Sequence, residues 1–598
     1  MTYPRRHVAF DLTGLWLGRH ALVCLPDLPP SGRAVDLRTK DTTRREARSA
    51  VGQAGPGPAT WPAANISAGL RANSWTPRAD PIVSGDSPPV PRHPWGTCGL
   101  LPPMKISTVV VLGAGSAGLM AALTLKRKLP HLGIRVVRSP DIGIIAVGEG
   151  TTSVFPRHFF EHLKIKPQAF YAEANPTWKL GIRFAWGAKR DFYYTFAYEF
   201  EKRQPELSRN NGFYHDPGQP WLGNASAFMA HDKVFPRRPD GFPRLHNNHA
   251  FHLENVTFVG WLENRCREAG VEITDATVSA EPGPQGVAAL VAESGERIVG
   301  DLYVDASGFR SELLGRLLAE PFLSYADTLF CDRAVVGGWA RGEGERIKPY
   351  TIAETMDAGW CWQIDHEKRV NRGYVYSSAF LSDEAALEEF ARKNPKIEPG
   401  LTRVVKFRSG RYHRSWVGNV VAVGNSAGFV EPLEATSLQV ICVETSTLAD
   451  SLSDSQCDPP PTLVAQFNRF NGEQWDDIRD FLAVHFRFNK RLDTPFWRHC
   501  REHVALHGAE PVVDFYRENG PSVVAGISLL SPSNSFKMDG YIALLTGQEV
   551  PYAKVHQATA AEQDHWRRRR AELAADAQQG LSPEEAMAAL RRPGLKWG

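Results

Sequence analysis

The chain contains the stretch Thr108-Val-Val-Val-Leu-Gly-Ala-Gly-Ser-Ala-Gly118, in which an apolar, β-branched run leads into glycines. The apolar run predicts a buried strand. Gly113, Gly115 and Gly118 follow in GxGxxG spacing, and residues 119–128 carry a helical pattern. Since a second strand is predicted at 134–137, the segment is typical of the opening unit of a Rossmann-like dinucleotide-binding fold.

The glycine turn is suited to a nucleotide. Its three glycines let the backbone approach a pyrophosphate, and the helix that follows presents free N–H groups and its positive end. Ser116 and Ala117, inside the turn, are predicted to contact the same group. An acid that holds the ribose is expected after the second strand, but Arg138 stands there. This arginine leaves open a 2′-phosphate, as in NADP.

A second glycine-rich segment, residues 423–437, favours FAD over a smaller nucleotide. A predicted strand ends at Gly424, and Pro432 predicts the start of a helix. Two glycine turns far apart in sequence suit a long dinucleotide, which Gly424, Asn425 and Gly428 are predicted to contact.

Composition narrows the class of protein. Hydrophobic residues make up 42% and charged residues 23% of the 598, as in a soluble globular protein. Residues 1–103 hold 12 of the 69 basic and 7 of the 66 acidic residues, so the remainder is close to neutral. Charge therefore gives no case for nucleic acid or a membrane as partner. The eight cysteines show no metal-ligand spacing, and we expect no metal site and a reduced, cytoplasmic protein.

The chain is predicted to divide at Met104. Residues 1–103 hold 15 of the 43 prolines and no hydrophobic period, which predicts disorder or a non-native extension before a natural start at Met104. Residues 104–450 are predicted to form an FAD-binding core, and residues 451–598 a helical subdomain with a long helix at 461–488. The expected fold is α/β, a Rossmann-like FAD-binding box of the flavin monooxygenase (GR2) type with mixed sheet insertions.

Four segments together resemble the flavin-dependent tryptophan halogenase family: residues 113–118, Val147-Gly-Glu-Gly-Thr-Thr152, Gly359-Trp-Cys-Trp-Gln-Ile364 and Gly428-Phe-Val-Glu-Pro-Leu-Glu434. The Trp-x-Trp-x-Ile element is specific, because related flavin hydroxylases share the glycine turns but lack it. The resemblance covers about residues 104–550 and implies FAD (as FADH2), O2 and chloride or bromide. The further residues that it assigns to the cofactor are Gly148, Glu149, Gly150, Thr151, Thr152 and Asp305.

The resemblance places the catalytic lysine at Lys179 and its paired carboxylate at Glu434. It implies that halide attacks a flavin C4a-hydroperoxide and that hypohalous acid reaches Lys179 through a tunnel. The apolar alternation after Lys179 indicates partial burial of its side chain. A chloramine mechanism needs a pKa lowered by roughly 2–3 units, whereas a hydrogen-bonded oxidant does not, and both stay open. Glu434 is expected to stabilise the cationic ring or to take its proton.

The resemblance also assigns the halide and the tunnel. The backbone N–H groups of Thr436 and Ser437 match the halide site, although the family more often has glycine at the second position. Trp360 and Trp362 match the two tryptophans that keep the organic substrate from the flavin. The family motif continues into proline, where this chain has Asp365, so a local difference in the loop is expected.

Substrate residues depart from those of members that act on free tryptophan. Tyr194 stands where such members carry histidine, while the aromatic Phe196 is retained. Their C-terminal Tyr-Tyr pair is reduced to Tyr541. Free tryptophan is therefore disfavoured, and larger indoles, phenols or a carrier- or peptide-bound aromatic are expected. The resemblance implies a separate flavin reductase as partner, and a homodimer is an open expectation.

Three functions remain open from the sequence. The first is a halogenase of an electron-rich aromatic ring. The second is a flavin-dependent aromatic hydroxylase, which would form product without halide. The third is a catalytically inactive flavin-binding homologue, motivated by Arg138, Asp365 and Ser437.

Overall fold

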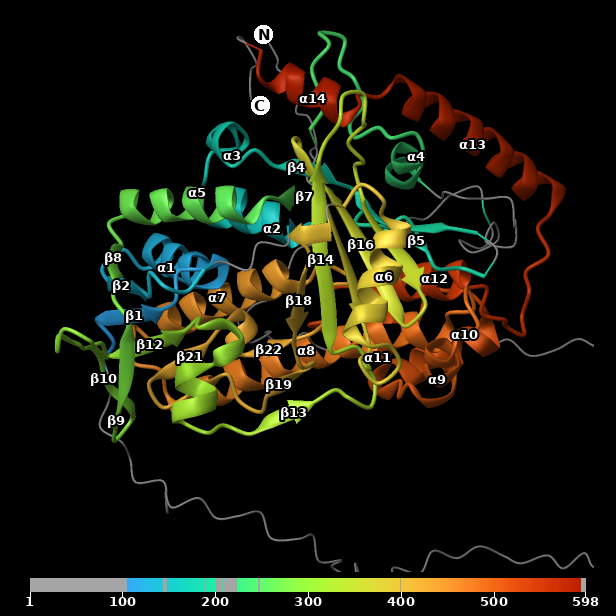
Figure 1. Cartoon of the computed structure of the whole chain (residues 1–598). Helices are drawn as coiled ribbons and strands as arrows, with labels where there is room; N and C mark the ends of the chain where they lie inside the picture. Colours follow the sequence, from blue (N-terminus) through green and yellow to red (C-terminus); the bar gives the residue numbers. More distant parts are fainter. Residues whose placement is uncertain are drawn as a thin grey trace, which may run out of the picture. The chain divides into compact units, whose positions relative to one another are not determined.

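A computed structural model describes residues 105–592 except 144–147, 189, 201–206, 208–222, 246–247 and 398. These residues belong to one compact unit of the chain, residues 96–598. The prediction for residues 1–103, with its start at Met104, lies outside the described part. Figure 1 shows the first strands, in blue, near an orange helix from the later part of the chain.

The predicted nucleotide fold is present as a six-stranded sheet in the order β20-β21-β12-β1-β2-β8 (Figure 1). Neighbouring strands are parallel, except for the antiparallel pair β20 and β21. The predicted first strand is confirmed, and the first helix begins three residues earlier than predicted. The bounds are β20 (Trp416–Val417), β21 (Val420–Ala422), β12 (Leu302–Asp305), β1 (Thr108–Leu112), β2 (Gly133–Arg138), β8 (Glu272–Asp275) and α1 (Ser116–Lys128).

A seven-stranded sheet, β18-β14-β17-β16-β15-β5-β6, forms the second layer of the core. Its pairs are antiparallel except β15 with β5. The strand with both motif tryptophans, β16, lies inside this sheet. The bounds are β18 (Arg403–Lys406), β14 (Arg333–Ala340), β17 (Arg369–Tyr376), β16 (Gly359–Asp365), β15 (Thr351–Met356), β5 (Gly181–Ala185) and β6 (Phe192–Thr195).

Three small sheets complete the strands of the described residues. In β3-β7-β4, the strand β4 ends on Lys179 and pairs with β7. The other two are β13-β19-β22 and β11-β10-β9. The bounds are β3 (Glu149–Gly150), β7 (Ala250–Leu253), β4 (Thr177–Lys179), β13 (Phe322–Ser324), β19 (Gly410–Tyr412), β22 (Gly428–Phe429), β11 (Arg297–Ile298), β10 (Gly286–Ala292) and β9 (Val278–Gly283).

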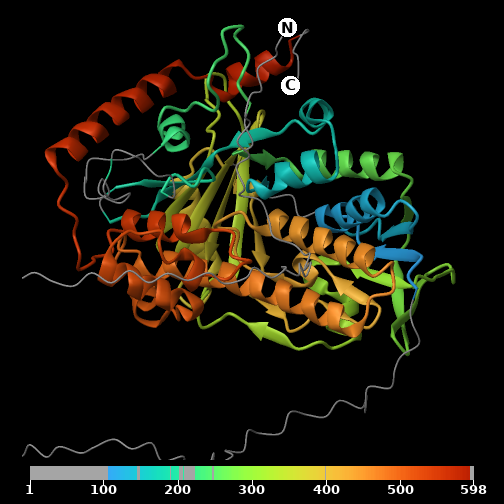
Figure 2. The same cartoon turned by 180° about the vertical axis from the view of Figure 1, so that it is seen from behind.

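Helices cover both large sheets. The long helices α7 and α8, in orange, lie side by side in Figures 1 and 2. Apolar residues of α8, α9 and α12 share one core with the seven-stranded sheet. The principal helices are α2 (Val154–Pro156), α3 (Pro167–Glu173), α4 (Asn224–Ala230), α5 (Asn255–Glu268), α6 (Asp383–Lys393), α7 (Ser437–Asp454), α8 (Pro461–Phe488), α9 (Pro495–His503), α10 (Glu510–Asn519), α11 (Gly526–Leu529), α12 (Lys537–Gly547), α13 (Ala560–Gln579) and α14 (Pro583–Leu590).

One predicted helix start is wrong. The helix predicted at 461–488 is confirmed, but Pro432 lies in a turn and α7 begins only at Ser437. Ala435 adopts a left-handed backbone with φ 55°, which no right-handed helix accommodates. The helix can therefore begin only after that residue.

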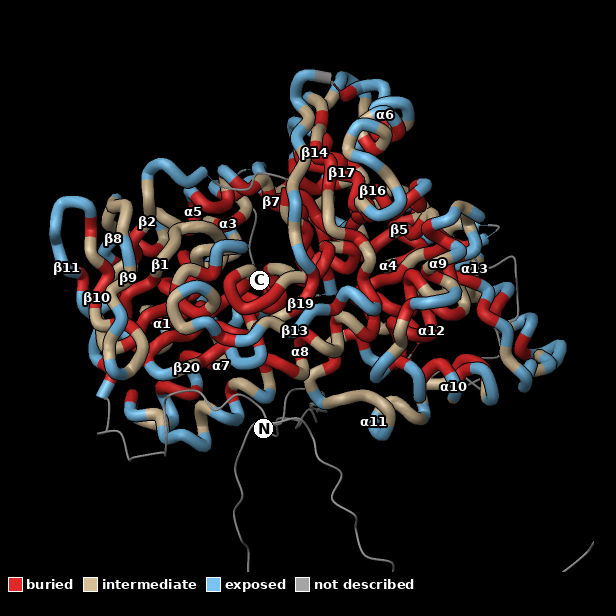
Figure 3. Tube along the Cα trace, turned by 60° about the horizontal axis from the view of Figure 1, so that its bottom comes forward, coloured by how far each residue is buried: buried red, intermediate tan, exposed pale blue. Residues whose placement is uncertain are grey.

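Burial follows the two large sheets (Figure 3). The central strands are mostly buried, while exposed residues gather on α6, α11 and the β9–β10–β11 hairpins. Within the described part of the chain, no helix is both long and apolar enough to cross a membrane.

Candidate active site

The predicted nucleotide residues meet at one edge of the six-stranded sheet. Strands β1, β12 and β21 are adjacent and parallel, so their carboxyl ends lie together. Gly113, Asp305 and Gly424 stand at or just after these ends. A Cβ atom at Gly424 would lie 3.0 Å from the Cβ of Ala117, so the two glycine turns abut. Such an edge is where open α/β sheets bind nucleotides.

The first glycine turn has the shape of a phosphate cradle. Gly113 has φ 112°, and a Cβ there would overlap the carbonyl of Ala306. Gly115 faces open space and caps α1 without a side chain, so the first N–H groups of that helix are free to bind an anion. Asn425 and Gly428, from the second turn, line a neighbouring pocket of about 320 Å³ that is rich in aromatic rings. These residues fit a dinucleotide.

Arg138 is engaged within the protein. Its guanidinium lies 2.6 Å from Asp275 and 2.8 Å from Glu263, and these hydrogen-bonded carboxylates raise its pKa. Its charge is therefore compensated, which removes the argument for a 2′-phosphate.

The carboxylate of Asp305 is likewise hydrogen-bonded within the protein. It accepts hydrogen bonds from the backbone N–H groups of Leu313 and Leu314 and from the N–H and hydroxyl of Ser307. Both oxygens are thus satisfied, and the side chain caps the short helix η4 (Glu312–Leu317).

The segment 148–152 runs between β7 and the start of α7. Asn255 accepts from the N–H of Gly148 at 2.7 Å and donates to the Glu149 carboxyl at 3.0 Å. Burial raises the pKa of Glu149 to about 7. The hydroxyl of Thr152 donates to Gln439 of α7 at 2.7 Å. A predicted cofactor segment is thereby joined to the predicted halide helix.

Lys179 is fully buried, beyond the partial burial that its sequence indicates. Its ammonium nitrogen Nζ donates to the carbonyl of Thr151 at 3.1 Å and lies 5.2 Å from the ring centroid of Phe196. A Cβ at Gly150 would lie 3.4 Å from Nζ, in van der Waals contact, and 3.0 Å from the Cβ of Ala435, which is tight. Desolvation lowers the pKa of Lys179 to about 7, against the opposing charge of Glu434.

Glu434 lies on the turn before α7 and is buried with His485 of α8. Its Oε1 lies 2.7 Å from His485 Nε2. Sequence reasoning missed His485, because it stands 51 positions from its partner inside an ordinary helical pattern. A histidine on the buried face of an otherwise apolar helix end is the signal that was available.

The predicted halide residues lie at the N-terminus of the 18-residue helix α7. Thr436 caps the helix without a side-chain hydrogen bond, and the first turn carries no acid. The left-handed Ala435 turns the chain directly before it. Free N–H groups at Ser437 and after it, together with the helix dipole, fit an anion.

Trp360 and Trp362 lie on one face of β16, with ring centroids 6.0 Å apart. Both are buried. The indole N–H of Trp360 donates to Glu431 at 2.6 Å, and the ring of Trp362 covers Gly373, where a Cβ would overlap it. The pair thus forms an anchored aromatic wall.

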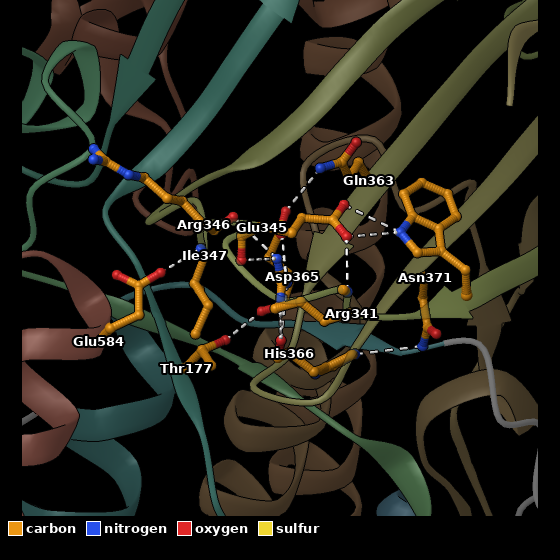
Figure 4. Close-up of polar contacts among 12 residues, drawn as sticks. Thr177, Arg341, Glu345, Arg346, Ile347, Gln363, Asp365, His366, Asn371 and Glu584 are labelled. Atoms are coloured by element: carbon orange, nitrogen blue, oxygen red, sulfur yellow. Dashed lines mark hydrogen bonds and ion pairs between the residues drawn. The ribbon is translucent and has the colours of Figure 1, made fainter. Parts of the chain in front are cut away.

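Asp365, the departure from the family motif, anchors the end of β16 (Figure 4). Its carboxylate accepts from Arg341 at 2.6 Å and Gln363 at 2.9 Å. Its backbone carbonyl accepts from the hydroxyl of Thr177 at 2.5 Å. Since Thr177 stands two residues before Lys179, this contact ties the tryptophan strand to the lysine strand.

Two of the predicted substrate residues, Tyr194 and Tyr541, lie around Phe481 of α8. Its ring centroid lies 5.9 Å from that of Tyr194 and 5.0 Å from that of Tyr541. Tyr541 is fully buried, and desolvation raises its pKa. Phe196 lies on the lysine side. Sequence reasoning missed Phe481, which one helix turn separates from His485.

The described residues contain no group of three or more His, Cys, Asp or Glu side chains suited to a metal ion. They do contain a sheet edge that fits a nucleotide, a helix end that fits an anion, a wall of two tryptophans, and a buried amine on which the charge of a buried carboxylate acts.

Comparison with known proteins gives concordant matches. The tryptophan halogenase family model matches residues 108–564. RebH, a tryptophan 7-halogenase of Lentzea aerocolonigenes, is 31% identical over 458 residues, which cover 72% of this chain and 84% of its own. ThaL, a tryptophan 6-halogenase of Streptomyces albogriseolus, is 32% identical over 445 residues, covering 70% and 83%. The crystal structure of MibH, a "lathipeptide tryptophan 5-halogenase", superposes with a TM-score of 0.74 at 38% identity, covering 83% of this chain and 96% of MibH.

Proposed function

Since the chain belongs to the tryptophan halogenase family, we propose that it halogenates an aromatic ring with FADH2, O2 and halide, and that Lys179 and Glu434 act on the substrate. It is a flavin-dependent halogenase, so the family match decides against the hydroxylase and the inactive homologue. The buried amine of Lys179, on which the charge of Glu434 acts and which lies near the Phe196 ring, carries the proposal for the site.

When a reduced flavin is bound, its reaction with O2 and chloride or bromide supplies the hypohalous acid that halogenation consumes. The two glycine turns, with Gly115 and Asn425, would hold the cofactor at the sheet edge. The N–H groups at the start of α7, at Thr436 and Ser437, would hold the halide. A separate flavin reductase would deliver the reduced flavin.

Lys179 receives the oxidant in this proposal. With its pKa near 7, the amine is divided between neutral and charged forms at neutral pH. The neutral form is a nucleophile for halogen, and the charged form donates a hydrogen bond to hypohalous acid. Water is excluded because the side chain is fully buried. Trp360 and Trp362 would keep the organic substrate on the lysine side.

We propose an aromatic group carried on a larger molecule, such as a tryptophan within a peptide, as substrate. Tyr194 replaces the histidine of members that act on free tryptophan, and their Tyr-Tyr pair is reduced to Tyr541. The similarity to MibH, a "lathipeptide tryptophan 5-halogenase", supports a substrate carried on a peptide. An indole ring would stack on the cluster around Phe481.

The test supplies FADH2 through an added reductase, with O2 and bromide or chloride. It offers free tryptophan, an indole, a phenol and a tryptophan-containing peptide, and reads product masses. Lys179→Ala is expected to abolish halogenation while flavin reoxidation continues. Lys128→Ala, at an exposed ion pair with Asp450, is the matched control and should behave as wild type. Full halogenation by Lys179→Ala would refute the assigned site.

A further inference from the structure

His485 is the closest partner of Glu434 among the described residues. Its Nε2 lies 2.7 Å from Glu434 Oε1, and both side chains are at most 1% exposed. The imidazole ring is held between Phe184, at 5.2 Å, and Phe481, at 5.1 Å between centroids. The Trp186 ring centroid lies 6.2 Å away, so three aromatic rings pack around the imidazole.

The hydrogen bond of His485 Nδ1 determines how many protons the pair of His485 and Glu434 carries. His485 Nδ1 lies 3.0 Å from the carbonyl oxygen of Phe481, and a carbonyl only accepts, so Nδ1 must carry a proton. His485 Nε2 and Glu434 Oε1 lie 2.7 Å apart, which is a hydrogen-bond distance, so a second proton lies between these two atoms. Whether this proton rests on Nε2 or on Oε1, the pair is neutral as a whole.

The surroundings favour the ion-pair form. His485 lies in the last turn of the 28-residue helix α8, whose negative end stabilises a cation. Lys179, from β4, acts electrostatically on Glu434, and Tyr541, from α12, packs on Phe481.

We propose that His485 is a positioning residue that keeps Glu434 able to accept a proton, so that the pair takes up the proton which the halogenated ring loses. This rests on the proposed function. In the step, the ring C–H bond breaks and its electron pair returns to the ring. An O–H bond forms on Glu434, which neutralises its carboxylate, and the imidazolium of His485 is left as the positive charge of the pair.

Two variants separate the two hydrogen bonds of the ring. His485→Gln keeps a donor toward Glu434 but cannot carry the proton, and His485→Asn keeps a donor toward the Phe481 carbonyl. His503→Gln is the matched control, because His503 makes the same bond to the carbonyl four residues earlier on α9 but is exposed. Thermal melting would check that each variant is folded.

The measurement follows hypohalous acid with a small-molecule scavenger, and halogenated product from ring-protonated and ring-deuterated indole. Both His485 variants are expected to form hypohalous acid at the wild-type rate and product about 10²-fold more slowly, with a primary deuterium isotope effect that the wild type lacks. His503→Gln should match the wild type. Full product yield in His485→Gln, or a slow reaction without the isotope effect, would overturn the proposal.

A second readout is independent of turnover. In the folded wild-type protein with ¹⁵N-labelled histidine, the His485 signals, assigned by their loss in His485→Gln, should show Nδ1 protonated. A neutral ring protonated only at Nε2 would overturn the proposal for the pair and leave the proposed halogenase standing. A wild-type chain that forms no halogenated product would overturn both.

Discussion

Lys179 links the chemistry of the site to the stability of the fold. Its pKa falls from an ordinary 10.5 to about 7, because burial disfavours the charged amine. Between these values the unfolded chain binds more protons than the folded one, so stability rises with pH across that window. We expect Lys179→Met to raise the free energy of unfolding by roughly 3–5 kcal/mol at about pH 6 and by far less at about pH 10. Denaturant unfolding of both proteins at each pH measures this.

Lys233→Met is the control at this scale. Lys233 is partly exposed and lies 3.4 Å from Glu585, so its substitution should leave the difference from wild type small at both pH values. If Lys179→Met raised the free energy of unfolding by the same amount at both pH values, burial would not be lowering the pKa of the Lys179 amine.

At the scale of elements, the ion pair of Asp365 and Arg341 joins β16 to the end of β14. Both side chains are buried. The backbone carbonyl of Asp365 also accepts a hydrogen bond from the hydroxyl of Thr177, on the lysine strand. Removing one partner leaves a buried charge, so Asp365→Leu and Arg341→Met should each destabilise the protein by about 3–5 kcal/mol. The double variant should cost much less than the sum. Unfolding free energies of the four proteins form the cycle.

An exposed pair provides the comparison for this cycle. Arg591 contacts Glu367 at 2.7 Å through both guanidinium nitrogens, yet it is largely exposed. Arg591→Met should therefore cost no more than about 1 kcal/mol. Additive effects of the two buried substitutions would show that Asp365 and Arg341 do not depend on each other.

At the scale of the whole molecule, the C-terminal helices support the lysine strand. Leu581 forms a β-bridge with Phe235, whose ring lies 5.3 Å from that of Trp178, next to Lys179. Deleting residues 560–598 would expose this cluster. We expect the shortened chain to bind a hydrophobic dye strongly and to lose halogenation, as fluorescence and product assays would measure.

Removing the other end should have the opposite outcome. Every predicted site residue lies between 105 and 592. A chain that begins at Met104 is therefore expected to keep full halogenating activity. If deleting residues 1–103 abolished halogenation while deleting residues 560–598 preserved it, the N-terminal segment and not the C-terminal helices would be needed for activity.

Some features could be predicted because they depend on neighbours along the chain. The apolar run at 108–112 and the GxGxxG spacing predict strand, turn and helix, and the structure has all three. Pro432 misled the same kind of reasoning, since the left-handed Ala435 delays the helix to Ser437. A backbone conformation imposed by the site overrode a local preference.

The amino-acid order by itself therefore determined the α/β class, the nucleotide turn and the family motifs, since each is written in residues close together in sequence. Only the tertiary structure decided that Lys179 is wholly buried, that Arg341 meets Asp365, and that Glu434 lies 2.7 Å from His485. Desolvation and such contacts depend on which distant segments pack together. That is why the lowered pKa of the Lys179 amine appears only once the chain is folded.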